Sequence, residues 1–90
     1  MEKVVSVTRA DGRLGLCYTI DTVMRRVSGG SMHFREEPSE GETPYPCDVL
    51  NAPHCSCLFM PKAEDDTFTE AYRAGGIRGL KRAMRQRLNP

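Results

Sequence analysis

The clearest structural signal in this 90-residue chain lies in the segment Val4-Val5-Ser6-Val7-Thr8-Arg9-Ala10-Asp11-Gly12-Arg13-Leu14-Gly15-Leu16-Cys17-Tyr18-Thr19-Ile20. Its first part is mostly β-branched, and apolar side chains recur at every second position from Leu14 to Ile20, which is the period of a strand with one buried face. Between the two parts, Asp11-Gly12 tolerates the positive φ of a tight turn. The segment therefore predicts a β-hairpin that directs Cys17 away from the core.

Downstream of the hairpin the patterns are weaker. Asp21 can cap a short helix that runs to Val27 and ends at Gly29-Gly30, although a third strand would accommodate the same residues. Residues 32–36 are a candidate for a short strand. Residues 55–60 predict another strand, and we expect it to be central in the sheet because both of its faces are apolar.

Residues 38–53 contain four of the six prolines of the chain together with several acidic side chains. Proline lacks the amide that a helix interior or a central strand requires, so this stretch cannot sustain either element. We expect a Pro-rich, acidic surface loop that is solvated along its length, and loops of this size are often functional.

The C-terminal part of the chain has the signals of a helix. Thr67-Phe68-Thr69-Glu70 fits a capping box, and the acidic run Glu64-Asp65-Asp66 before it suits the positive end of the helix dipole. We expect the helix to begin at Thr67, to be kinked or broken at Gly75-Gly76, and to run to Leu88.

Together these elements predict a single α+β domain over residues 1–90. We expect a small antiparallel sheet made of the N-terminal hairpin and the strand near 55–60, packed on one face against the amphipathic helical segment 67–88. A chain of 90 residues can bury only one modest core, which excludes two domains.

The net charge of +1 conceals an asymmetry along the chain. Residues 1–66 carry seven Lys or Arg against eleven Asp or Glu, whereas residues 67–90 carry six against one. On a helical wheel, basic side chains gather on a face beside the apolar one, and they are Arg78, Lys81, Arg82 and Arg85. Unless the acidic loop neutralises this face, it predicts a docking surface for the carboxylates of a partner protein or the phosphates of a nucleic acid.

Three of the four cysteines and one of the two histidines cluster between residues 47 and 57, and Cys17 and His33 are available from elsewhere. Such residues can form a tetrahedral zinc site. Because the spacing lacks the paired Cys-x₂-Cys of zinc knuckles, free thiols buried as small apolar side chains are the alternative, and a redox thiol or a disulfide is a further one. We therefore expect either no cofactor or one structural zinc, with the candidate ligands Cys47, Cys55, Cys57 and His54.

No motif in the sequence names a reaction. A catalytic thiol would need a base that His54 does not provide for Cys55, because adjacent side chains diverge on a strand. We therefore expect a non-enzymatic, partner-binding regulator, an inhibitor or adaptor of the kind that phages and mobile elements encode. A nucleic-acid-binding module, with or without zinc, is the alternative, and a thiol or metal-dependent enzyme is a third.

An acidic protein surface is the partner that the sequence favours. Residues 1–66 are net negative and would repel a long polyanion, and the basic segment offers few aromatic side chains on which bases could stack. No apolar run approaches the length of a membrane span, and the chain begins without a signal-peptide core. We expect a cytoplasmic protein that does not contact a membrane.

Overall fold

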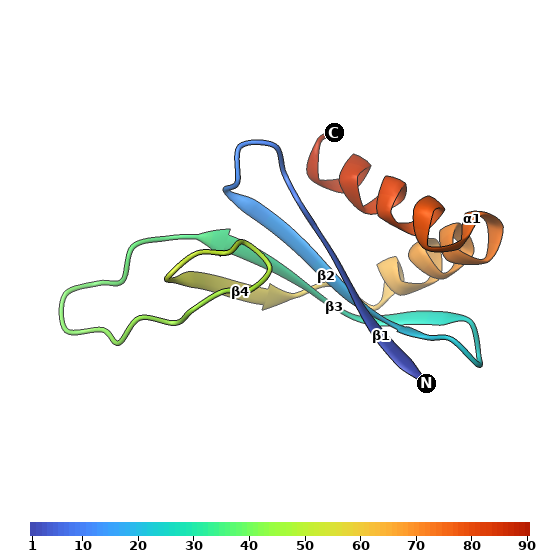
Figure 1. Ribbon diagram of the computed structural model, residues 1–90, viewed down its shortest axis with the longest axis horizontal. Helices are drawn as coiled ribbons and strands as arrows, with labels where there is room; N and C mark the ends of the chain where they lie inside the picture. The colour runs from blue at the N-terminus through green and yellow to red at the C-terminus, as the bar shows by residue number, and fades with distance from the viewer.

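The computed structural model, which describes residues 1–90, has one four-stranded antiparallel sheet and one helix packed on a face of that sheet (Figure 1). The strand order is β1-β2-β3-β4, so each strand pairs with its neighbour along the chain. The elements are β1 (Glu2–Thr8), β2 (Leu14–Asp21), β3 (Arg26–Arg35), β4 (Cys55–Phe59) and α1 (Ala63–Leu88). The predicted α+β fold, with its N-terminal hairpin, a strand near 55–60 and a C-terminal helix, is confirmed.

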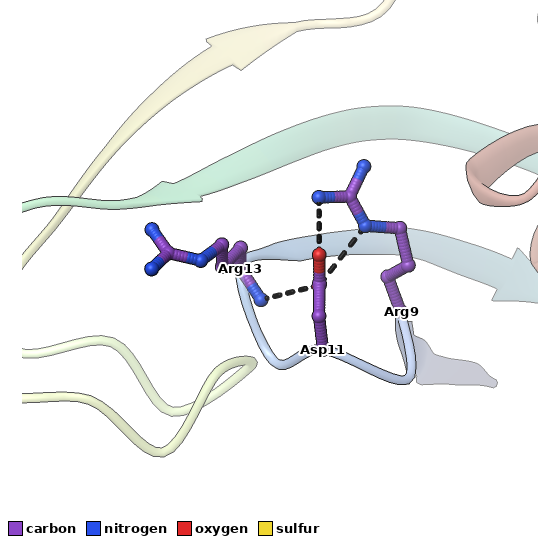
Figure 2. A network of polar contacts seen from close by, with 3 residues as sticks. All are labelled: Arg9, Asp11 and Arg13. Carbon is purple, nitrogen blue, oxygen red and sulfur yellow. Dashed lines mark hydrogen bonds and ion pairs between the residues drawn. The ribbon is translucent and has the colours of Figure 1, made fainter.

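The hairpin forms because the turn between β1 and β2 is held by its own side chains. Arg9 donates two hydrogen bonds to the Asp11 carboxylate, with N···O distances of 2.9 and 2.6 Å, and the Arg13 amide donates a third of 3.0 Å (Figure 2). Gly12 adopts the expected positive φ of 71°. The Arg9 guanidinium and the Arg13 amide stabilise the ionised carboxylate, and they lower the pKa of Asp11 to about 2.

The predicted short helix from Asp21 to Val27 is wrong, and the alternative of a third strand is right. Asp21 accepts hydrogen bonds of 3.0 Å from the amides of Val23 and Met24, so its carboxylate closes a tight turn instead of capping a helix. β3 then begins at Arg26 and pairs Val27 with Ile20 of β2. Both of these β-branched side chains are fully buried on one face of the sheet, and β-branched residues are enriched in strands.

The predicted central position of the strand near 55–60 is also wrong, because β4 lies at the edge of the sheet and pairs only with β3. The apolar residues on its two faces differ in burial. Cys55 is buried because the preceding loop covers it, whereas Leu58 and Phe59 are 50% and 89% exposed. The apolar composition of β4 therefore does not report burial within the sheet.

The helix begins earlier than the capping box indicates. α1 starts at Ala63, after Lys62, which makes no side-chain capping bond, and Glu64 and the two aspartates after it occupy the first turn. Thr69, assigned to the capping box, is instead buried against β3. Gly76 has φ 66° and ψ −159°, outside the helical region, so two helical segments meet there at a kink that is visible in Figure 1.

The main core lies between α1 and the face of the sheet that the alternating residues of β2 present. The side chains at its centre are fully buried, and they are Leu16, Tyr18, Ile20, Val27, Leu80 and Met84. The centroid of the Tyr18 ring lies 4.7 Å from that of the Phe68 ring. The Tyr18 ring also lies over Gly30, where a side chain on residue 30 would collide with the ring. Although α1 has 26 residues, no part of it is apolar over enough length to cross a membrane.

Candidate functional site

The loop between β3 and β4 consists of two different halves. Residues 39–46 are exposed, as expected for a solvated loop. Residues 47–52 instead fold back over the sheet, where Cys47 and Ala52 exchange two backbone hydrogen bonds of 2.9 and 3.0 Å. With Leu50 and Cys55, they form a second small core that the composition of the loop did not predict.

Gly15 allows this second core to form. A Cβ atom at Gly15 would lie only 2.6 Å from Cγ1 of Val49, so a residue with a side chain there would push the loop away from β2. The hydroxyl of Thr8 also donates a hydrogen bond of 3.0 Å to the carbonyl of Val49. Because Gly15 alternates with Leu16 along β2, the loop lies on the face of the sheet opposite α1.

Three metal-ligating side chains converge in this region. Nδ1 of His33 lies 3.7 Å from Sγ of Cys47 and 3.8 Å from Sγ of Cys55. The three potential ligand atoms lie within 4.8 Å of one another and come from β3, the loop and β4. Both cysteines are buried and His33 is half-buried. This His33/Cys47/Cys55 cluster could hold a metal ion.

The surroundings of the cluster orient its members. Oγ of Ser31 lies 3.0 Å from Nε2 of His33, and the amide of Leu50 donates to Sγ of Cys47 at 3.4 Å. Burial and the adjacent Cys47 raise the pKa of the Cys55 thiol to about 12, and desolvation lowers the pKa of His33. Both shifts disfavour the charged form of the side chain, the thiolate of Cys55 and the imidazolium of His33.

The structure brings together two of the four ligands that the sequence suggested, namely Cys47 and Cys55. Cys57 is exposed on β4, directly across from His33. His54 is buried but engaged elsewhere, because its Nδ1 accepts a hydrogen bond of 2.7 Å from the Tyr45 amide. The histidine of the cluster is thus His33, which the sequence offered only as a residue available from elsewhere.

The second candidate region is the exposed side of the C-terminal half of α1. We call Arg78, Lys81, Arg82 and Arg85 the basic surface. The three arginines are exposed and Lys81 is half-buried. Arg78 and Arg85 border two shallow, open depressions, one shared with Arg82, Gln86 and Asn89 and the other with Ile77 and Lys81. The four cations therefore form one continuous patch, as the helical wheel predicted.

No acidic side chain of the chain neutralises the basic surface. The ion pairs of the structure join Arg9 to Asp11, His54 to Glu42 and Arg87 to Glu64, and none involves the four cations. The acidic loop projects from the end of the sheet farthest from α1 (green in Figure 1). Two carboxylates near the loop have other contacts: Glu36 accepts a hydrogen bond of 2.7 Å from Ser56, and Glu42 lies 3.4 Å from Nε2 of His54.

Comparison with known proteins gives no match. No family model matches the chain, and no curated protein and no solved structure matches it either. The function must therefore be inferred from the basic surface and from the His33/Cys47/Cys55 cluster.

Proposed function

We propose that this protein is a small, non-enzymatic binding domain, a regulator such as an inhibitor or adaptor, whose basic surface docks on an acidic patch of a partner protein. The observation that carries the proposal is the lack of any ion pair on these four cations. Their neighbour Arg87 is neutralised by Glu64 at 2.7 Å, so the chain can provide such pairs and does not do so here.

The arrangement of the four cations is unfavourable without a partner. Arg78 and Arg82, and likewise Lys81 and Arg85, lie one helical turn apart, and each such pair of like charges costs roughly 0.2–0.5 kcal/mol before screening by salt. Carboxylates of a partner would remove this repulsion, and guanidinium groups bind carboxylates through two parallel hydrogen bonds. Ile77, half-buried beside Lys81, provides an apolar anchor next to the charges.

A protein partner is better supported than a nucleic acid. The net charge of the chain is only +1, and its acidic loop would be repelled by an extended polyanion. The two aromatic residues of α1 are not available for base stacking, since Phe68 is buried and Tyr72 is half-buried under the guanidinium of Arg25, 5.9 Å from its ring centroid.

A thiol enzyme is less well supported, although His33 and Cys47 form a cysteine–histidine pair. Cys47 and Cys55 are only 4% and 3% exposed, which leaves a substrate no access to either sulfur. The raised pKa of Cys55 is also opposite to that of an activated nucleophile. Four free cysteines support a reducing compartment, and the proposed location is therefore the cytoplasm.

The proposal is tested by comparing two double variants with the same change in charge. Arg82→Glu/Arg85→Glu alters the basic surface, whereas Arg13→Glu/Arg35→Glu alters exposed arginines at the far end of the sheet. Each protein is expressed in the native host, cross-linked in cells and purified, and the retained proteins are identified. We expect the first variant to lose a partner that the wild type and the second variant keep.

The same proteins are titrated with fluorescent single-stranded and duplex oligonucleotides at about 50 mM salt, where phosphate contacts are strong. We expect weak binding that the variants do not change. Micromolar or tighter binding that only the Arg82→Glu/Arg85→Glu variant abolishes would establish a nucleic-acid partner instead. Identical retained partners for both variants would show that the basic surface is not the docking site.

A further inference from the structure

We propose that His33, Cys47 and Cys55 are three ligands of a zinc ion that fastens the second half of the β3–β4 loop to the sheet. This site differs from the set expected from the sequence, because His33 replaces His54 as the nitrogen ligand. It is independent of the proposed docking function, since the cluster lies on the face of the sheet opposite α1.

The distances from His33 to the two sulfurs match those that a zinc ion would impose. Zinc bonds of about 2.0–2.1 Å to imidazole nitrogen and about 2.3 Å to thiolate sulfur, at a tetrahedral angle, place nitrogen and sulfur about 3.6 Å apart. The two observed separations between Nδ1 of His33 and the sulfurs are 3.7 and 3.8 Å. The two nitrogen–sulfur separations therefore agree with tetrahedral binding, and the two sulfurs lie within 4.8 Å of each other.

His33 is oriented in the way that metal-binding histidines usually are. Its Nδ1 faces both sulfurs, while its Nε2 lies 3.0 Å from the hydroxyl oxygen of Ser31. With the proton on Nε2, the ring donates to Ser31 and directs the lone pair of Nδ1 between Cys47 and Cys55. A hydrogen bond from the ring nitrogen that does not bind the metal selects the tautomer and fixes the plane of the ring. Packing of apolar side chains alone would give no reason for this orientation.

The sulfur ligands are also suited to the bound state. The Leu50 amide donates to Sγ of Cys47, and such a contact stabilises a thiolate more than a neutral thiol. Zinc binds cysteine as the thiolate, so binding releases one proton to solvent for each thiol that becomes a ligand. Sulfur and nitrogen donors without a carboxylate favour zinc over magnesium or calcium.

Two further thiols flank the cluster and can supply the fourth ligand. Cys57 lies opposite His33 in the β3–β4 register, on the same side of the sheet. Cys17 on β2 pairs with Ser31 of β3 and lies on the same side of the sheet. Either thiol would complete a closed Cys₃His site of the structural type.

The test uses the full-length, reduced wild-type protein. After purification without chelators, we expect about one equivalent of zinc, and after its removal one equivalent of Co²⁺ should give the ligand-field and thiolate charge-transfer absorption of a tetrahedral site. Release of at least two protons per ion should accompany binding. Substoichiometric metal in a folded sample, a Co²⁺ spectrum without thiolate bands, or a disulfide between Cys47 and Cys55 would each overturn the proposal.

Matched variants then identify the histidine. His33→Asn should weaken zinc binding by more than about 100-fold, which exceeds the loss usual for a residue that only hydrogen-bonds to a metal ligand. His54→Asn should leave the zinc affinity unchanged. Ser31→Ala should weaken it by about 10–100-fold without changing the stoichiometry at saturating zinc. Equal affinities for wild type and His33→Asn would overturn the assignment. If a variant does not fold, the proton release and cobalt spectrum of the wild type still decide whether the thiols bind the ion.

Discussion

Replacing Thr69 with valine should destabilise the protein strongly, although valine has nearly the same shape as threonine. Thr69 lies on α1 and is 7% exposed. Its hydroxyl oxygen accepts a hydrogen bond of 2.9 Å from the Val27 amide, and the hydroxyl donates one of 3.2 Å to the Val27 carbonyl. β4 pairs with β3 only from Ser31 to Arg35, so the hydroxyl serves the part of the β3 edge that β4 does not reach.

The expected loss follows from the two backbone groups that Thr69→Val leaves without partners. A buried polar group that loses its partner costs about 1–3 kcal/mol, and a carbonyl less than an amide, so the sum is about 2–4 kcal/mol. Thr69→Ser is the matched control, because it keeps the hydroxyl and removes one methyl group, at a cost of about 1 kcal/mol. For a domain of this size, the two variants should lower the Tm by about 10–30 °C and about 4–8 °C.

The measurement is equilibrium unfolding in urea, together with thermal melting followed by far-ultraviolet circular dichroism. Amide exchange should locate the effect, because the Val27 amide should lose protection in Thr69→Val and keep it in Thr69→Ser. A Thr69→Val variant that is within 1 kcal/mol of the wild type, or more stable than Thr69→Ser, would refute the assignment of stability to these hydrogen bonds.

Three further predictions concern the turn and the core. Arg9→Ala should raise the pKa of Asp11 from about 2 towards its ordinary value of 3.8, as measured by carboxyl NMR titration. Because the pKa of Asp11 is lowered in the folded protein, its stabilisation is present above about pH 4 and is lost as the pH falls to about 2. An unchanged titration midpoint of Asp11 in Arg9→Ala would contradict the ion pair. Gly30→Ala should cost about 1–3 kcal/mol in urea unfolding because the new methyl group meets the ring of Tyr18, and a neutral effect would show that the ring can move. Met84→Ala, at a fully buried position, should cost about 2–5 kcal/mol, and a Tm within about 4 °C of the wild type would be evidence against the packing of α1.

The features that the sequence predicted correctly depend on residues that are close together along the chain. The hairpin follows from the alternation of β2 and from a turn that Asp11 and Gly12 form locally. The basic surface follows from helical spacing, because side chains three and four residues apart share one side of a helix in any tertiary context. The positive charge of this side of α1 was therefore visible before the structure.

The features that the sequence predicted wrongly or incompletely depend on contacts between distant residues. Whether Val27 belongs to a helix or a strand depends on its pairing with Ile20, and the edge position of β4 depends on which side of β3 remains free. Local patterns contain no information on either pairing. Both faces of β4 are apolar in sequence, but among its apolar side chains only Cys55 is covered, whereas Cys57, Leu58 and Phe59 are exposed.

The His33/Cys47/Cys55 cluster shows the same division. Spacing along the chain grouped His54 with the cysteines, because these residues are neighbours in the sequence. In the folded protein, His33 reaches the two sulfurs because β3 and β4 pair in register and because Gly15 leaves room for the loop on β2. The types of residue available to bind a metal were thus set by composition, whereas the choice among them was made by strand register and by close packing against a glycine, which are properties of the tertiary fold.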